Sequence, residues 1–345
     1  MIAAAALLGY AVLLMTAAAP ALASVGWPER APRLAIAVWL ALAFSVIMSV
    51  MLAGLAMLVP APQVSRGLAW LLAVCGWQLR ARYAHPGGTA LAAAGVLVAV
   101  VLAARLAWCA LSSMSASARA GRSHRLRLRL AGRRDDRLGV LVVEHREPAA
   151  YCMSGASRPV VLTTAALRLL DEPQLAAVLA HERAHQAGRH HLLVSLAAVP
   201  AAAFPWVPAF RQARDEVARL AELAADDVAA ARSPRLAVAE ALLTLGAAPA
   251  APAVAWALGA GDSTAGARVR RLIAAPNPLS RAASAAGALA VAALVALPLI
   301  LLAAPAFGAL GTGHHPRPGT LTAYTGTAYP GTAYTGAAYQ GRAAH

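Results

Sequence analysis

Four long apolar segments constrain this chain more than any other feature of its sequence. They cover residues 2–25, 34–59, 89–111 and 285–310. A helix needs about 20 apolar residues to cross the hydrocarbon core of a bilayer, and each of these segments is long enough. A fifth apolar segment, 68–79, is too short to cross, so we expect it to lie in the interface or to pack on the bundle. The sequence therefore predicts a mainly α-helical membrane protein with about four transmembrane helices.

The first apolar segment has two interpretations. It ends in Ala21-Leu22-Ala23, which resembles a signal-peptidase site, but it lacks the positively charged start of a signal peptide. We interpret it as a retained transmembrane helix, and cleavage is the alternative.

The apolar segments divide the chain into four parts. Residues 1–115 form a membrane domain with three transmembrane helices, 116–284 a globular domain, and 285–310 the fourth helix. The tail, 311–345, repeats a five-residue unit rich in Tyr, Gly and Thr. Such a composition cannot bury a core, so we expect this tail to be disordered.

The basic residues bear on partners and on orientation. All 30 are arginine, and eight of them lie between Arg119 and Arg137, directly after the third apolar segment. No Phe, Trp or Tyr is interleaved with them, which speaks against direct nucleic-acid binding and favours contact with lipid headgroups. Because arginine near the ends of spans marks the cytoplasmic side, we expect residues 116–284 in the cytoplasm and both termini outside.

Within the globular domain, short strands precede two helices. Segments 124–130, 139–143 and 159–163 have the alternating or β-branched pattern of strands. Asp171-Glu172-Pro173 predicts the start of a helix that continues to Gly188, and a second helix is expected over 209–232. Segment 191–208 is apolar but contains three prolines, which favours a re-entrant or interfacial hairpin over a full span.

The first of these helices carries the motif HExxH, formed by His181, Glu182 and His185. Residues four apart share one face of a helix, so both imidazoles can bind one metal ion. The carboxylate of Glu182 can accept a proton from a water molecule that zinc activates. The motif predicts a metallopeptidase with one zinc ion per chain.

The sequence offers two candidates for a third metal ligand. The longer pattern HExxHxxGxxH, with Gly188 and His191, is that of the metzincins. Metzincins also need a methionine turn after the helix. The last methionine here is Met153, which precedes the motif, so the sequence offers no such turn.

The other candidate is Glu222, four residues before Asp226 on the second helix. Glu222 would complete a site of two histidines and one glutamate, with one position left for water. Asp226 would accept the outer N–H of a ligand histidine, for which we favour His181. We favour Glu222 over His191; the alternative for Glu222 is a solvated helix face.

Several of these motifs resemble one family. Segment 159–163, the helix start at Asp171, and the runs QLAAVLAHERAH and ELAAD look like the BlaR/MecR-type membrane peptidases of bacteria and their sensorless relatives. The HtpX and CAAX-prenyl peptidases are similar at the same motifs. The resemblance implies a cytoplasmic, α+β, gluzincin-like domain in a multi-pass protein of the cell membrane, with His181, His185 and Glu222 as ligands and Glu182 as base.

The same resemblance implies two further features. A substrate would lie extended along an edge strand formed by Pro159, Val160, Val161, Leu162 and Thr163. Arg268 is a candidate for stabilising the oxyanion, although any single arginine of its cluster is more often a lipid or surface contact. Two departures stand out: no penicillin-binding domain follows the last span, and Asp262 lies near where the HtpX-like group has a histidine.

Three functions fit this sequence. The first is regulated cleavage of a protein substrate, with a penicillinase-repressor-type transcription factor as the expected target. The second is quality control of membrane proteins. The third is a non-catalytic signalling protein with a structural zinc site, which would have no need of Glu182 and would prefer four protein ligands. Besides substrate, the lipid bilayer and a second copy of the chain are candidate partners.

Overall fold

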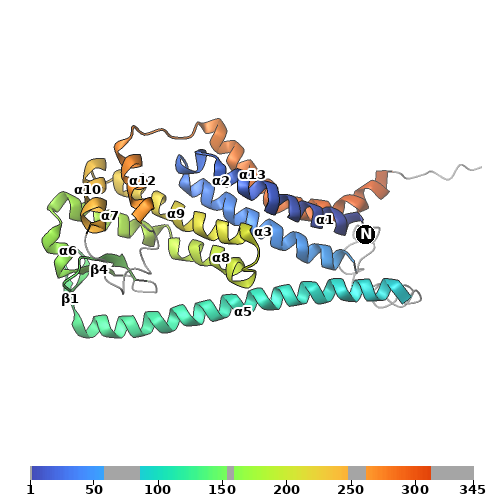
Figure 1. Cartoon of the computed structure of the whole chain (residues 1–345), viewed down its shortest axis with the longest axis horizontal. Helices are drawn as coiled ribbons and strands as arrows, with labels where there is room; N and C mark the ends of the chain where they lie inside the picture. The colour runs from blue at the N-terminus through green and yellow to red at the C-terminus, as the bar shows by residue number, and fades with distance from the viewer. Residues whose placement is uncertain (1, 58–85, 154–158, 248–261, 312–345) are drawn as a thin grey trace, which may run out of the picture.

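The computed structural model describes residues 2–57, 86–153, 159–247 and 262–311. The predicted segment 68–79 and nearly all of the predicted tail lie outside these residues. The described chain is mostly helical, with one small sheet at the end of the molecule far from the N-terminus (Figure 1). The helical elements before the sheet are α1 (Ile2–Leu13), η1 (Leu14–Ala18), α2 (Ala19–Ser24), η2 (Trp27–Glu29), α3 (Pro32–Ala56) and α5 (Pro86–Ala131).

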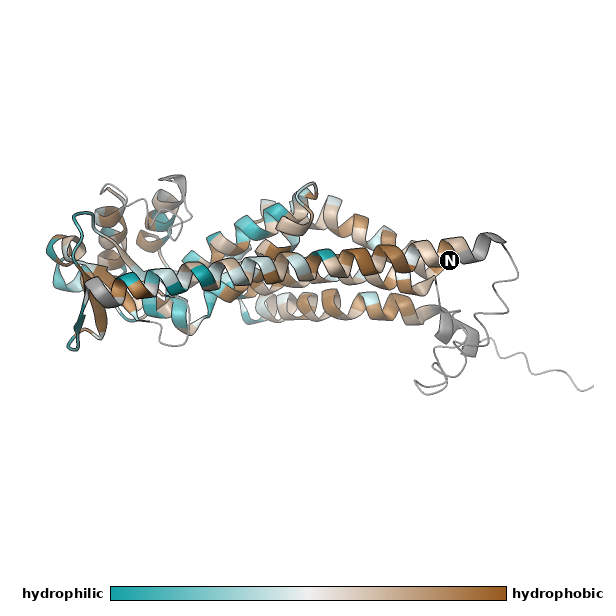
Figure 2. Cartoon of the chain, turned by 90° about the horizontal axis from the view of Figure 1, so that it is seen from below, coloured by the Kyte–Doolittle hydropathy of each residue, from teal (hydrophilic) through white to brown (hydrophobic). Residues whose placement is uncertain are grey.

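Four helical segments in the described part of the chain are long and apolar enough to cross a membrane. They are Ile2–Ser24, Pro32–Ala56, Ala90–Leu128 and Arg281–Ala304, the last being part of α13 (Arg281–Gly311). Figure 2 shows the hydrophobic colour gathered in the half of the molecule that holds the N-terminus, and hydrophilic colour around the sheet. The prediction of four apolar spans is confirmed at this level, and the fold is compatible with a multi-pass membrane protein.

Helix α5 runs without a break into the region where a strand was predicted. It ends at Ala131 and leads directly into β1 (Gly132–Asp135), so the strand over 124–130 is wrong and the expected boundary at 115 falls inside a helix. Two residues apart, Leu126 and Leu128 would share one face of a strand, but here Leu126 is 62% exposed and Leu128 only 5%. That difference is what a helix produces, because it turns residues i and i+2 to opposite sides.

The sheet has four short strands in the order β1-β2-β4-β3, with β2 (Val140–Val143), β3 (Ala150–Cys152) and β4 (Val160–Thr163). Strands β2 and β4 are parallel, and the other two pairs are antiparallel. The predicted strands 139–143 and 159–163 are confirmed. However, β4 is paired on both sides, so its predicted role as an edge strand is wrong. All four residues of β4 are buried, as expected for an internal strand, and β3 is the edge beside it.

The two predicted helices are confirmed as α7 (Glu172–Ala187) and α9 (Pro208–Ala230). Asp171 caps α7 in a capping box with Gln174, and Pro173 lies in the first turn, where its missing N–H costs nothing. The remaining helices are α6 (Thr164–Leu169), α8 (His190–Ala203), α10 (Arg235–Gly246) and α12 (Asp262–Ile273).

The hairpin predicted within 191–208 is wrong, because α8 is a single helix of 14 residues that contains Pro200. At about 1.5 Å per residue it is too short to cross a bilayer. The chain turns back only after α8, so that α8 and α9 pack together as a longer pair of helices, the α8–α9 hairpin. Arg105 of α5 holds its tip, since its Nε donates to the carbonyl of Ala203 and its guanidinium lies 5.2 Å from the ring centre of Trp206.

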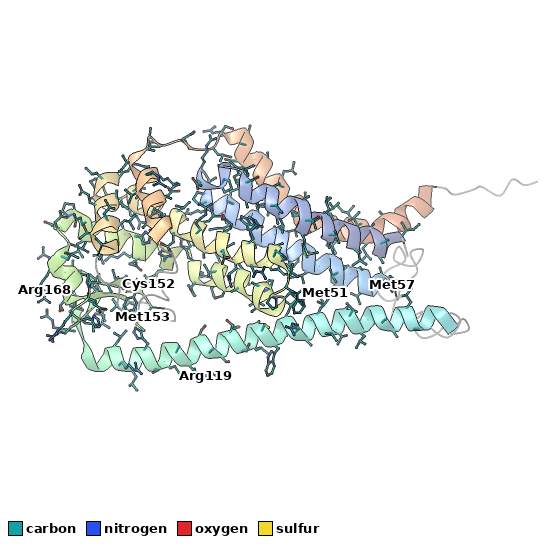
Figure 3. The ribbon with its side chains drawn as sticks, in the orientation of Figure 1. Met51, Met57, Arg119, Cys152, Met153 and Arg168 are labelled. Carbon is teal, nitrogen blue, oxygen red and sulfur yellow. The ribbon has the colours of Figure 1, made fainter. Side chains whose placement is uncertain are left out.

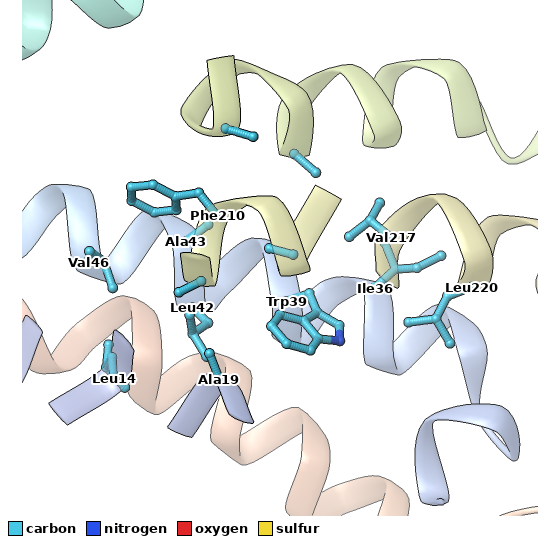
Figure 4. Close-up of a cluster of buried hydrophobic side chains, with 14 of the residues drawn as sticks. Leu14, Ala19, Ile36, Trp39, Leu42, Ala43, Val46, Phe210, Val217 and Leu220 are labelled. Carbon is cyan, nitrogen blue, oxygen red and sulfur yellow. The ribbon is translucent and has the colours of Figure 1, made fainter. Parts of the chain in front are cut away.

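The largest hydrophobic core joins this hairpin to the apolar helices. Trp39 of α3 is fully buried and packs in one cluster with Phe210, Val217 and Leu220 of α9 (Figure 4). Since α9 also contacts α7, the packing of α3 against α9 ties the position of α7 to the apolar helices.

Candidate metal centre and active site

Helices α7 and α9 bring three possible metal ligands together. His181 and His185 lie one turn apart on α7, with their Nε2 atoms 3.1 Å from each other. Glu222 of α9 faces both, with Oε2 3.5 Å from Nε2 of His181 and Oε1 3.4 Å from Nε2 of His185. These three residues form a group that could hold one metal ion.

The spacing of this triangle fits a tetrahedral zinc ion. Donors about 2.0–2.1 Å from zinc at tetrahedral angles lie about 3.3 Å from one another. The two histidine nitrogens are 3.1 Å apart, and each has a different oxygen of Glu222 at 3.5 or 3.4 Å, so one donor from each residue can reach a single ion. The side chains keep 14%, 16% and 23% of their surface exposed, so water and a substrate can reach the open side of the triangle.

Asp226 and Arg268 form a charged pair behind His181. Oδ1 of Asp226 lies 3.0 Å from Nδ1 of His181, and both carboxylate oxygens accept hydrogen bonds from Arg268, at 2.8 and 2.7 Å. Nη1 of Arg268 also lies 3.0 Å from Glu222. Arg268 is only 8% exposed, so its interpretation as a surface or lipid contact is wrong.

The outer nitrogen of His185 faces a residue that the sequence did not single out. Nδ1 of His190, at the start of α8, lies 3.0 Å from Nδ1 of His185. His191, the alternative third ligand, is not a member of the group that could hold the metal. The nearest signal in the sequence is the pair His190-His191 after Gly188, of which only His191 fits the spacing of a known ligand pattern.

Glu182 lies against the edge strand β3. The backbone N–H and the thiol of Cys152 both hydrogen-bond with its carboxylate. Burial raises the pKa of Glu182 to about 7, even though His181 and Cys152 act in the other direction. Burial and the neighbouring Glu182 raise the pKa of the Cys152 thiol to about 12. Cys152 is the last residue of β3, next to Met153 (Figure 3), and no sequence pattern indicates its contact with Glu182.

One family model covers this site. Residues 119–245 match the model of Peptidase family M48. No curated protein and no solved structure matches the chain. The M48 match begins in α5 and ends in α10, so it contains the three possible ligands, Glu182 and Asp226 but not Arg268. It indicates a metallopeptidase domain of a family that is generally zinc-dependent, and it does not distinguish the BlaR/MecR type from the HtpX type.

The charges of this site suit a cation. Burial opposes ionisation of Glu222, but His181 and Arg268 outweigh it and lower the pKa of its carboxyl to about 2. Burial would lower the pKa of His181, yet Asp226 and Glu222 raise it to about 10, whereas burial lowers that of His185 to about 4. The lowered pKa of Glu222 leaves its carboxylate anionic at neutral pH, which is the form that binds a metal ion.

Proposed function

We propose that this protein is a membrane-bound zinc metalloendopeptidase. The observation that carries the proposal is the triangle of His181, His185 and Glu222 beside the partly buried Glu182, inside the segment that matches a peptidase family. The three side chains would hold one zinc ion. When bound, zinc would supply Lewis-acid chemistry, polarising the scissile carbonyl and making water acidic enough to attack near neutral pH.

Glu182 acts as the general base and then as the general acid. Its carboxylate takes a proton from the attacking water and delivers it to the leaving nitrogen. A pKa raised to about 7 suits both steps, because the group can hold and release a proton near neutral pH. The N–H of Cys152 orients this carboxylate from the side of the sheet.

The substrate lies along β3 instead of β4. The N–H of Met153 donates to the carbonyl of Pro159, and the carbonyl of Ala149 accepts from Thr163. In an antiparallel pair the backbone groups of the residues between alternate, so those of Ala150 and Cys152 point away from β4. In the described part of the chain that side of β3 has no strand partner. An extended peptide can add there as a further strand through the backbone of Ala150 and the carbonyl of Cys152, while the N–H of Cys152 stays with Glu182.

Arg268 acts by holding the site together. Its Nε and both Nη atoms face Asp226 or Glu222, which leaves the guanidinium committed to carboxylates and not to an oxyanion. It fixes Glu222 against the two histidines, and it neutralises Asp226 behind His181.

The physiological role we propose is regulated cleavage of a cytoplasmic protein, with a penicillinase-repressor-type transcription factor as the target class. The support is the resemblance of the motifs to BlaR/MecR-type peptidases and the arginines that flank the apolar segments. A nearby encoded repressor that stays intact when the peptidase is induced would contradict this role.

Quality control of membrane proteins is the second candidate. It is favoured by the packing of the α8–α9 hairpin against α3, which places the site next to apolar helices that a membrane substrate could approach. Unchanged levels of misfolded membrane proteins after loss of the peptidase would exclude it.

The proposed chemistry is tested with Glu182→Gln in the full chain, purified in detergent. Removal of the base should lower the rate of cleavage of an unstructured protein by about 10²–10⁴-fold while zinc content stays at the wild-type level. Glu172→Gln, an exposed change at the start of the same helix, is the matched control and should keep wild-type activity. Equal cleavage by the Glu182→Gln variant would refute the assignment.

A further inference from the structure

His190 faces the nitrogen of His185 that points away from the ligand triangle. The two Nδ1 atoms are 3.0 Å apart, and the rings meet edge to face at 85° with their centres 4.8 Å apart. His190 is only 4% exposed, so its ring has exchanged water for this contact. A buried polar ring is costly unless its nitrogen is paired.

A left-handed turn between α7 and α8 places His190 against His185. Gly188 ends α7, and Arg189 follows with φ of 49°, the left-handed conformation that L residues rarely adopt. Among the described residues Arg189 is the one non-glycine with a positive φ. Such strain persists only where the surroundings enforce it, and it often marks a functional position.

Gly188 provides the room for the ring. Its own φ of −76° is open to any residue, so the glycine is not needed for backbone conformation. A Cβ on Gly188 would lie 2.4 Å from Nε2 and 2.6 Å from Cδ2 of His190, closer than real Cβ contacts. A side chain at Gly188 would therefore push His190 away from His185.

We propose that His190 is a positioning residue of the metal centre, and this inference rests on the proposed function. To bind a metal through Nε2, neutral His185 must carry its proton on Nδ1. That Nδ1–H then donates to Nδ1 of His190, which keeps its own proton on Nε2. His190 thus fixes the tautomer and the ring orientation of His185, and Asp226, 3.0 Å from Nδ1 of His181, is placed to do the same on the other side of the triangle.

Asp226 and His190, the outer partners of the two ligand histidines, differ in charge. Asp226 is anionic and is neutralised by Arg268, whereas an imidazole at position 190 orients His185 without adding a further buried negative charge. Loss of such an outer partner typically weakens metal binding by about 10–100-fold.

The test is the zinc dissociation constant of the full-length protein in detergent, measured by competition with a chromogenic chelator. His190→Ala should weaken zinc binding by about 10–100-fold, and His190→Asn should stay within about threefold of wild type, since its amide oxygen can accept the same N–H. Gly188→Ala should behave like His190→Ala, and His191→Ala, the adjacent control, like wild type. With cobalt in place of zinc, the visible absorption bands should change in His190→Ala and not in His190→Asn.

The outcomes separate this inference from the proposed function. Wild-type zinc affinity in His190→Ala would overturn the inference and leave the peptidase site intact. Equal losses in His190→Ala and His190→Asn would also overturn it, because the N–H acceptor would then not be what matters. A wild-type protein that binds no zinc would instead overturn the proposed function.

Discussion

Replacing Arg268 with methionine should destabilise the protein strongly, because Asp226 would lose its arginine partner while its carboxylate stays buried. Asp226 is 0% exposed, and Arg268 donates to both of its oxygens at 2.8 and 2.7 Å. Removing one partner of a buried ion pair costs about 3–5 kcal/mol, and Asp226 would then stay buried with only His181, at 3.0 Å, beside its carboxylate. At about 2–4 °C per kcal/mol for a domain of this size, the melting temperature should fall by roughly 10 °C.

The assay is thermal unfolding of purified protein in detergent with a chelator present, so that bound metal does not add to the stability of one variant more than another. Arg271→Met is the matched control. Arg271 lies on the same helix and pairs with Asp227 at 2.7 Å, but these side chains are 20% and 41% exposed. An ion pair that water reaches contributes about 0–1 kcal/mol, so this control should unfold near the wild-type temperature.

A double variant separates the pair from the packing of the arginine side chain. If the cost arises from the unpaired carboxylate, replacing Asp226 with leucine in the Arg268→Met background should restore more than half of the lost stability. A loss in Arg268→Met no larger than in Arg271→Met would refute the buried pair. No recovery in the double variant would show that the loss comes from packing.

Three further predictions follow from the site and the helix packing. Burial raises the pKa of Glu182 to about 7, so this base becomes protonated below that pH. The value of kcat/KM should therefore fall about tenfold per pH unit on the acid side. A flat profile from about pH 8 to pH 5 would contradict the role of Glu182 as the base. Asp226→Asn should weaken zinc binding by about 10–100-fold in chelator competition, and unchanged affinity would show that the carboxylate does not support its histidine. Gly54→Ala should destabilise the contact between α3 and α5 by about 1–3 kcal/mol in thermal unfolding, because its Cβ would lie 2.4 Å from the carbonyl oxygen of Gly95. Gly9→Ala is the control and should have no such effect, since its Cβ would have nothing within 4 Å. Equal melting temperatures of the two variants would refute the close approach.

The parts of the site that follow from local spacing could be predicted from the sequence. His181 and His185 share a face because a helix turns once in about 3.6 residues, and Asp171 and Gly188 mark the ends of that helix. Glu222 and Asp226 were found by the same argument on a second helix, and the structure brings that helix against the first.

The parts that depend on tertiary packing could not be predicted. The alternation of Arg and Leu before β1 is typical of a strand, but those residues continue α5, on which Leu128 packs against Met153 and Val161 while Leu126 is exposed. The position of β4 inside the sheet depends on pairings with β2 and β3, which one strand's sequence does not reveal.

The same holds for two neighbours of the site. His190 reaches His185 only through the left-handed turn at Arg189 and the open space at Gly188, and Arg268 reaches Asp226 from a helix 42 residues further along the chain. No local pattern encodes either contact, since both depend on how separate elements meet.

Zinc per chain, measured by elemental analysis of protein purified in detergent, decides whether His181, His185 and Glu222 hold a metal ion. We expect about one zinc in the wild type, loss of zinc in Glu222→Ala, and retention in Glu182→Gln and His191→Ala. Zinc that is kept in Glu222→Ala and lost in His191→Ala would contradict the ligand set, and a wild-type protein without zinc would contradict the metallopeptidase itself.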